Sequence, residues 1–205
     1  MNRKRGFVLA AAALAFSLIG MFPSLAAGQD MSAQDQKMME QMMKYGTPGK
    51  NHELFKLYAG MWDVDISMWQ NPGAPPMMSK GTMKNEMIFD GRYLKCDFQG
   101  EMSGMKVGGL EVIGYDLFKN MYTTFWIDSW STSFVVTTGM LDGTGKVLTE
   151  TGMFPDMMTD GKTMQKVKNV TTFLADGKYK FEMFMVGPDG REMKSMELLC
   201  TRREP

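Results

Sequence analysis

The chain has 205 residues, with 23 Lys and Arg against 23 Asp and Glu, so its formal net charge at pH 7 is zero. Nucleic acids and anionic membranes bind basic patches, and a balanced chain favours neither as a partner. A single histidine excludes a metal centre built from several histidines, and two cysteines alone do not supply the four ligands that zinc requires.

The first 26 residues have the pattern of a secretory signal peptide. Arg3, Lys4 and Arg5 precede an apolar run over residues 7–19, and Ser24-Leu25-Ala26 forms a small-x-small cleavage site. The apolar run is shorter than the roughly 20 residues that a membrane span needs, and no later segment approaches that length. We therefore expect a periplasmic or secreted protein whose mature chain has no integral membrane segment and carries 20 Lys and Arg against 23 Asp and Glu.

Residues 27–46 form a Met-rich segment, predicted as a helix or linker. Ser32 is a plausible N-cap and Gly46 a plausible C-cap, with a stripe of methionines between them at positions 38, 39, 42 and 43. Three interpretations remain open: the stripe packs against the rest of the protein or a partner, the segment is disordered, or its thioethers bind Cu(I). A second short helix is predicted over residues 51–60, which include the only histidine, His52, with an expected structural role.

From Trp62 onward the hydrophobic period changes to two. Trp62, Val64 and Ile66 alternate with polar residues, which is typical of a half-buried strand. Strand-like segments then follow one another without a helical pattern between them, at residues 82–89, 92–100, 106–115, 121–130, 133–141, 146–154, 163–174, 179–186 and 191–202. This order predicts one all-β domain over residues 47–205, an antiparallel up-and-down barrel of about 8–10 strands.

Turn residues support the barrel. Asp-Gly, the dipeptide that tight hairpins with positive φ prefer, occurs five times, at residues 90–91, 142–143, 160–161, 176–177 and 189–190. The last four are separated by about one strand and a turn each. A meander of this kind would leave two exposed edges if it stayed open, and closure into a barrel removes them.

Gly60-Met61-Trp62 stands at the start of the first strand, after a short helix, and resembles the Gly-x-Trp motif of lipocalin and calycin barrels. In that group the tryptophan seals the barrel base and an arginine from the last strand packs over its ring. The resemblance implies structural roles for Gly60, Trp62 and Arg202. Arg202 shares its strand parity with the apolar set of Met196 and Leu198, whereas Arg203 points the other way.

A more extensive resemblance covers residues 46–203. The segments "TPGKNHELFKLYAGMWDVDISMW", "PGAPPMMSKGTMKNEMIFDGRYL", "GLEVIGYD", "WIDSWST" and "GPDGREMKSMEL" together resemble the domain of unknown function family 1579. The family implies a small, often exported barrel domain without an established reaction or agreed catalytic residues. The Met-rich segment lies outside this resemblance.

Cys96 and Cys200 are the only cysteines, and export would place them in an oxidising compartment. One disulfide between them is the expected arrangement. Two buried free thiols are the alternative.

The segment "MYTTFWIDSWST" carries the candidate ligand site. In a strand, Tyr122, Trp126, Asp128 and Trp130 face one side, and aromatic walls with one carboxylate suit a small-ligand cavity. Arg92 follows a turn and is a candidate for pairing with a carboxylate at the barrel end. The alternative is that these rings pack in a core or subunit contact and that Asp128 bonds backbone or arginine.

These residues predict binding rather than catalysis. A serine triad would have to use His52, and no Gly-x-Ser-x-Gly pattern accompanies it, so no catalytic residue, metal or cofactor is expected. The main hypothesis is an exported barrel that binds a small, mainly apolar ligand. The alternatives are a packed envelope protein that contacts another chain and, third, Cu(I) handling.

Overall fold

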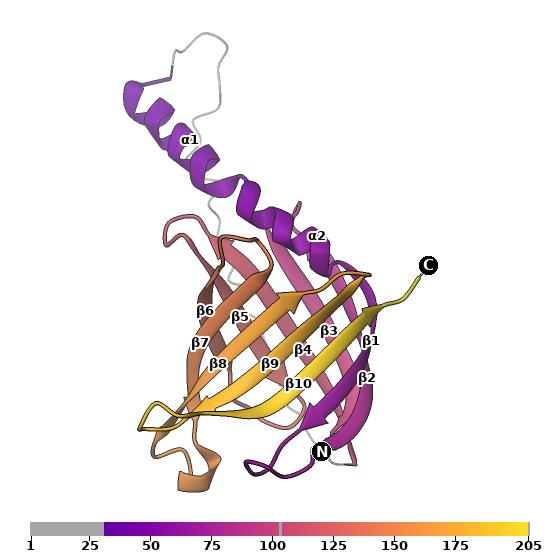
Figure 1. Cartoon of the computed structure of the whole chain (residues 1–205). Helices are drawn as coiled ribbons and strands as arrows, with labels where there is room; N and C mark the ends of the chain where they lie inside the picture. The colour runs from indigo at the N-terminus through magenta and orange to yellow at the C-terminus, as the bar shows by residue number, and fades with distance from the viewer. Residues whose placement is uncertain (1–30, 103, 205) are drawn as a thin grey trace, which may run out of the picture. The chain divides into compact units, whose positions relative to one another are not determined.

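The computed structural model describes residues 31–102 and 104–204, so the predicted signal peptide lies outside the described residues. Short helical elements precede ten strands (Figure 1). The helical elements are α1 (Ala33–Gly46), η2 (Lys50–Glu53), α2 (Leu54–Tyr58) and the later η3 (Met157–Thr159). The strands are β1 (Gly60–Met68), β2 (Met77–Ile88), β3 (Tyr93–Met102), β4 (Met105–Asp116), β5 (Met121–Asp128), β6 (Val135–Leu141), β7 (Val147–Pro155), β8 (Met164–Phe173), β9 (Lys178–Val186) and β10 (Glu192–Arg202).

The strands close into one antiparallel barrel. Each strand pairs with its neighbours in sequence, and β10 pairs with β1. The closing register sets Trp62 opposite Arg202 and Met68 opposite Met196. The pairing of β10 with β9 has an irregularity between Lys194 and Met196. The predicted all-β up-and-down barrel is confirmed, with ten strands.

The chain divides into two compact units, one ending at Met42 and one beginning at Met43. Within α1, the Ser32 hydroxyl accepts a hydrogen bond from the Asp35 N–H at 3.2 Å, so Ser32 acts as the N-cap. The four methionines of the predicted stripe are exposed by 44–64%. Among the described residues, no helix combines the length and apolar character needed to cross a membrane.

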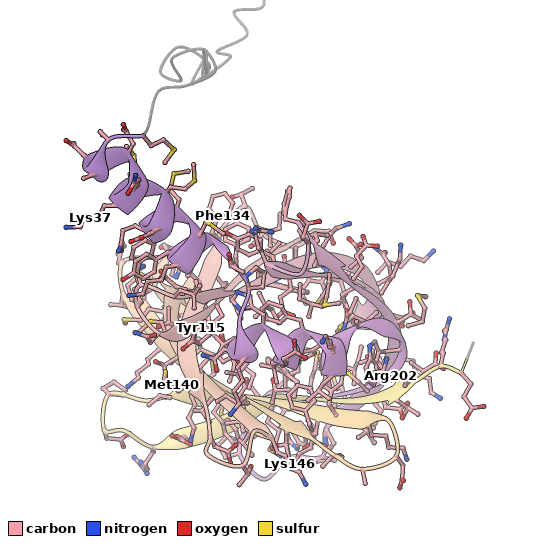
Figure 2. The ribbon with its side chains drawn as sticks, turned by 90° about the horizontal axis from the view of Figure 1, so that it is seen from above. Lys37, Tyr115, Phe134, Met140, Lys146 and Arg202 are labelled. Atoms are coloured by element: carbon pink, nitrogen blue, oxygen red, sulfur yellow. The ribbon has the colours of Figure 1, made fainter. Side chains whose placement is uncertain are left out.

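The base of the barrel is the end at which β1 begins. The short helix α2 lies across this end and packs against β2 and β3 (Figure 2). Phe55 and Trp62 are at most 1% exposed, and the ring of Tyr179 meets the Trp62 ring edge-on at a centroid distance of 4.7 Å. His52 is buried here too, and its Nδ1 atom accepts the Gly49 N–H at 3.0 Å. The base is therefore a packed aromatic plug.

Trp62 and Arg202 lie together in this plug. The Arg202 guanidinium carbon is 4.2 Å from the Trp62 ring centroid, and its nitrogens donate to the carbonyls of Ala59 and Leu57. The Trp62 indole N–H donates to the Tyr58 carbonyl at 2.7 Å. Gly60 adopts φ +132°, and a Cβ atom there would lie 2.5 Å from an Arg202 nitrogen. The glycine of the Gly-x-Trp motif thus makes room for the arginine that covers the tryptophan.

Three of the five Asp-Gly pairs adopt positive φ at both residues, namely those at 90–91, 160–161 and 176–177. The other two differ. At Asp142 the carboxylate accepts the backbone N–H groups of Lys146 and Val147, and the positive φ falls on Gly145. At Asp189 only the following Gly190 has positive φ.

Candidate functional site

The inward residues differ in exposure between the two halves of the barrel. Near the base the inward side chains of Leu94, Ile113 and Leu148 are at most 2% exposed. In the other half, inward positions keep exposed surface although strands surround them, as at Trp126 and Met183. Others of this kind are Met68, Phe154, Gln165, Asn169, Phe181, Met185 and Met196. The interior is thus packed at the base and open to solvent toward the far rim.

Two carboxylic acids project into the middle of this interior. Glu111 of β4 pairs in register with the buried Cys96 of β3, and Glu150 of β7 pairs with Asn169 of β8. Glu150 is 5% exposed. Glu111 lies among the side chains of the interior but keeps partial solvent exposure, so its carboxyl group is not part of the packed core.

Threonine hydroxyls hold Glu150. Thr124 donates to Glu150 Oε1 at 2.7 Å, and Thr137 donates to the same oxygen at 3.4 Å. Thr124 and Thr137 face each other across β5 and β6. Two inward hydroxyls thus fix one carboxyl oxygen and orient the Glu150 side chain.

The environment raises the pKa of both acids. Burial raises the pKa of Glu111 to about 7, with a further contribution from the nearby Glu150 carboxylate. Burial also raises the pKa of Glu150, although the bonds from Thr124 and Thr137 oppose that shift. Two acids that share a low-dielectric space disfavour simultaneous ionisation, so the pair holds protons more tightly than ordinary glutamates.

Trp126 of β5 is the register partner of Glu111 and forms the wall beside it. The indole N–H donates to Asp128 Oδ2 at 2.9 Å, and the ring lies over Gly109. A Cβ atom at position 109 would lie 2.0 Å from the Trp126 ring. The glycine and Asp128 therefore hold the ring against the β4 backbone, toward the rim.

The other predicted ligand residues occupy different places. Tyr122 is 1% exposed and its hydroxyl donates to the Asn51 carbonyl at 2.7 Å, so it belongs to the base. Asp128 Oδ1 accepts the backbone N–H groups of Trp130 and Ser131, which ends β5 and leaves Trp130 44% exposed in the following loop. The structure brings the side chains of Trp126 and Asp128 together, whereas the Trp130 side chain is exposed in the loop.

Arg92 does not point into the barrel interior. It lies in the turn between β2 and β3, where its side chain donates to the carbonyls of Gly46 and Phe89 and meets the Asp90 carboxylate at 3.4 Å. With Phe89, Asp90 and Tyr93 it lines a separate solvent-open hollow at this turn. No carboxylate of the interior pairs with it.

The predicted Cys96–Cys200 disulfide is not formed. Both cysteines are free and at most 1% exposed. The strand order places β1 and β2 between β10 and β3, so the two residues are three strand steps apart. Each step is about 4.8 Å, whereas a disulfide requires Cα atoms within about 7 Å. Burial raises the pKa of each thiol, which disfavours the reactive thiolate form.

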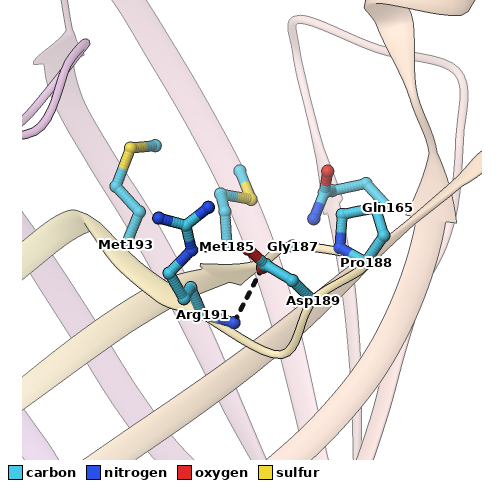
Figure 3. Close-up of a pocket in the computed structure, with 7 residues that line it drawn as sticks. All are labelled: Gln165, Met185, Gly187, Pro188, Asp189, Arg191 and Met193. Carbon is cyan, nitrogen blue, oxygen red and sulfur yellow. Dashed lines mark hydrogen bonds and ion pairs between the residues drawn. The ribbon is translucent and has the colours of Figure 1, made fainter.

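A hollow of about 500 Å³ lies at the open rim, where the turn after β9 leads into β10 (Figure 3). Met185, Met193 and Gln165 line it together with the turn residues Gly187, Pro188, Asp189 and Arg191. Asp189 Oδ1 accepts the Arg191 N–H at 3.1 Å and shapes the turn. The hollow is mainly apolar and does not contain either interior carboxyl group.

Sequence reasoning missed Glu111 and Glu150. The available signal was parity: Glu111 alternates with Gly109 and Ile113, and Glu150 follows Leu148 by two residues. A lone acid in an apolar strand position is unusual enough to mark a candidate site.

Comparison with known proteins places the barrel in a family. No curated protein matches the sequence. Among solved structures, the S-type phycobiliprotein lyase CPES from Guillardia theta is similar with a TM-score of 0.51 and 11% identity, over 76% of this chain and 93% of the lyase. At that identity the likeness shows the calycin-like fold alone. The model of the family described as protein of unknown function (DUF1579) matches residues 47–202, and the chain therefore belongs to that family.

Proposed function

We propose that the protein is an exported barrel that binds a small, mainly apolar ligand in the open half of its interior. The observation that carries the proposal is the pair Glu111 and Glu150, which lie inside a barrel whose inward methionine and aromatic side chains keep exposed surface. Apolar walls with a few polar groups are the usual composition of small-ligand sites.

The packing supports this location for the ligand. Trp126, Phe181 and Met196 pack against the buried core on one side and retain solvent-accessible surface on the other. Such side chains lose water contact when a ligand enters, at about 25 cal/mol for each Å² of apolar surface removed from water. The base cannot serve in the same way because its aromatic residues are already buried.

A neutral solvatochromic dye such as Nile red tests this function. We expect saturable binding with a blue-shifted emission. Met183→Trp fills an inward position of the open half and should weaken binding about tenfold or more, since the larger side chain takes the space of the dye. Met153→Trp is the matched control, because Met153 is 50% exposed and points outward. Absence of saturable binding, or equal loss in both variants, would contradict the proposal.

Export is a separate part of the proposal and rests on residues 1–26. The mature protein is expected to begin at residue 27, after the Ser24-Leu25-Ala26 site. Intact mass measurement of the protein recovered from the periplasm of a bacterial host tests this. Recovery of the full-length mass from the cytoplasm alone would contradict export and leave the binding proposal standing.

A further inference from the structure

The interior of the barrel carries hydrogen-bond acceptors in two rows. In the first row, Asn85 of β2, Cys96 of β3 and Glu111 of β4 are consecutive register partners on the inward side. In the second, Glu150 of β7 and Asn169 of β8 are direct partners. Each carboxylic acid thus has an asparagine in its own row.

Both asparagines present an oxygen without a donor. Asn85 is 3% exposed, and its Nδ2 atom donates to the Tyr58 carbonyl at 3.1 Å, whereas its Oδ1 atom has no partner. Asn169 Oδ1 is likewise buried without a partner. Buried acceptors are normally paired with a donor, so these two oxygens are available to accept a hydrogen bond from a ligand.

The protein does not supply a cation to the two acids. Among the described strands, Arg202 is the one basic residue at an inward position, and it lies over Trp62 at the base. Thr124 and Thr137 donate only to Glu150, and Glu111 has Cys96 beside it. Buried carboxylates are normally paired with a positive charge, and the raised pKa values of these acids reflect its absence.

We infer that the ligand is an amphipathic amine, whose ammonium group enters between Glu111 and Glu150 while its apolar part lies against the methionine and aromatic side chains of the open half. This inference rests on the proposed function. An ammonium group provides three donors and one positive charge, so it satisfies a carboxylate and at least one asparagine oxygen together.

Displacement of Nile red at pH 8 by three compounds tests the inference. The compounds are octylamine, 1-octanol and octanoate, which share one chain length and differ in the headgroup. We expect octylamine to bind at least tenfold more tightly than octanol, and octanoate to bind most weakly. In Glu111→Gln/Glu150→Gln the preference for the amine over octanol should fall to within about threefold. A cooperative urea unfolding transition of the variant shows that it is folded.

The outcomes separate the inference from the function on which it rests. If octanol and octylamine bind equally, or if the double variant keeps the full preference, the amine inference is wrong while a binding barrel remains. If the dye binds and none of the three compounds displaces it, the amine inference is also wrong. If neither the dye nor any of the compounds binds the wild-type protein, the proposed function fails as well.

Discussion

At the base of the barrel, Phe55, Trp62 and Tyr179 are at most 3% exposed. The rings of Trp62 and Tyr179 meet edge-on, and the Trp62 indole N–H donates to the Tyr58 carbonyl. In the open half, Trp126 and Phe181 occupy equivalent inward positions and keep solvent-accessible surface. The same ten strands form both regions, and the difference comes from α2, which closes one end only. Stability is therefore expected to depend on the base, and ligand preference on the open half.

The largest effect expected from this contrast concerns Trp62. Trp62→Ala removes a side chain that is 1% exposed and also the surface on which Arg202 stacks. We expect a loss of about 3–5 kcal/mol in the free energy of unfolding, measured by urea denaturation. Trp130→Ala, at a tryptophan that is 44% exposed beyond the end of β5, is the control and should cost about 0.5 kcal/mol or less. Similar losses in both variants would remove the distinction between plug and rim.

Glu111 is expected to give the next largest effect, and here the substitution should stabilise the protein rather than destabilise it. Its folded pKa of about 7 lies above the ordinary value of 4.5, so between these pH values the unfolded chain releases the proton more readily than the folded one. The contribution of Glu111 to stability is therefore present below about pH 4.5 and is lost as the pH rises to 7, by roughly 3 kcal/mol.

Glu111→Gln removes this titration and should stabilise the protein at pH 8 relative to wild type. Urea midpoints measured between pH 4.5 and 8 test the prediction. Glu197→Gln is a matched surface control, because Glu197 lies on the outer side of β10 and pairs with Lys194. A wild-type curve without the decline would contradict the prediction. A decline that is retained in Glu111→Gln would show that Glu111 does not cause it.

His52 should give the smallest effect and belongs to the base. Burial lowers its pKa below 6.5, so the unfolded chain takes up the proton first as the pH falls. Stability contributed by neutral His52 is present above pH 6.5 and lost on acidification. His52→Gln should reduce the acid-side loss by less than about 1 kcal/mol, measured by thermal unfolding between pH 5 and 7.5. Acidification would then lower the stability that the base contributes and raise the stability that the carboxyl pair contributes.

Local sequence patterns were sufficient to predict the barrel. Alternation in each strand and the Asp-Gly pairs are local properties, and they predict about 8–10 strands joined by short turns. Parity also predicts that Trp126 and Asp128 share the inward side. It could not predict that β5 ends at Asp128, because that end depends on the carboxylate bonding to the backbone of Trp130 and Ser131.

Parity could mark Glu111 and Glu150 only as candidates, because the side of the sheet on which each lies depends on long-range register. The outer face of β4 is also apolar, at Leu110 and Val112, so alternation alone does not say on which side Glu111 lies. Only the pairing of Glu111 with buried Cys96 settles the side. The disulfide was predicted wrongly for a related reason: parity places both cysteines inward, but their separation depends on the order of strands around the barrel.

The pairing of β1 with β10 has a consequence for how the chain acquires its fold. Trp62 and Arg202 are register partners although most of the domain lies between them in sequence. Until β10 is available, β1 and β9 each present an unpaired edge, and such edges promote misassembly. Synthesis from the N-terminus delivers β10 last, so closure is expected only after the whole domain has been made. Truncation of the final strand should therefore cause aggregation rather than a slightly smaller barrel.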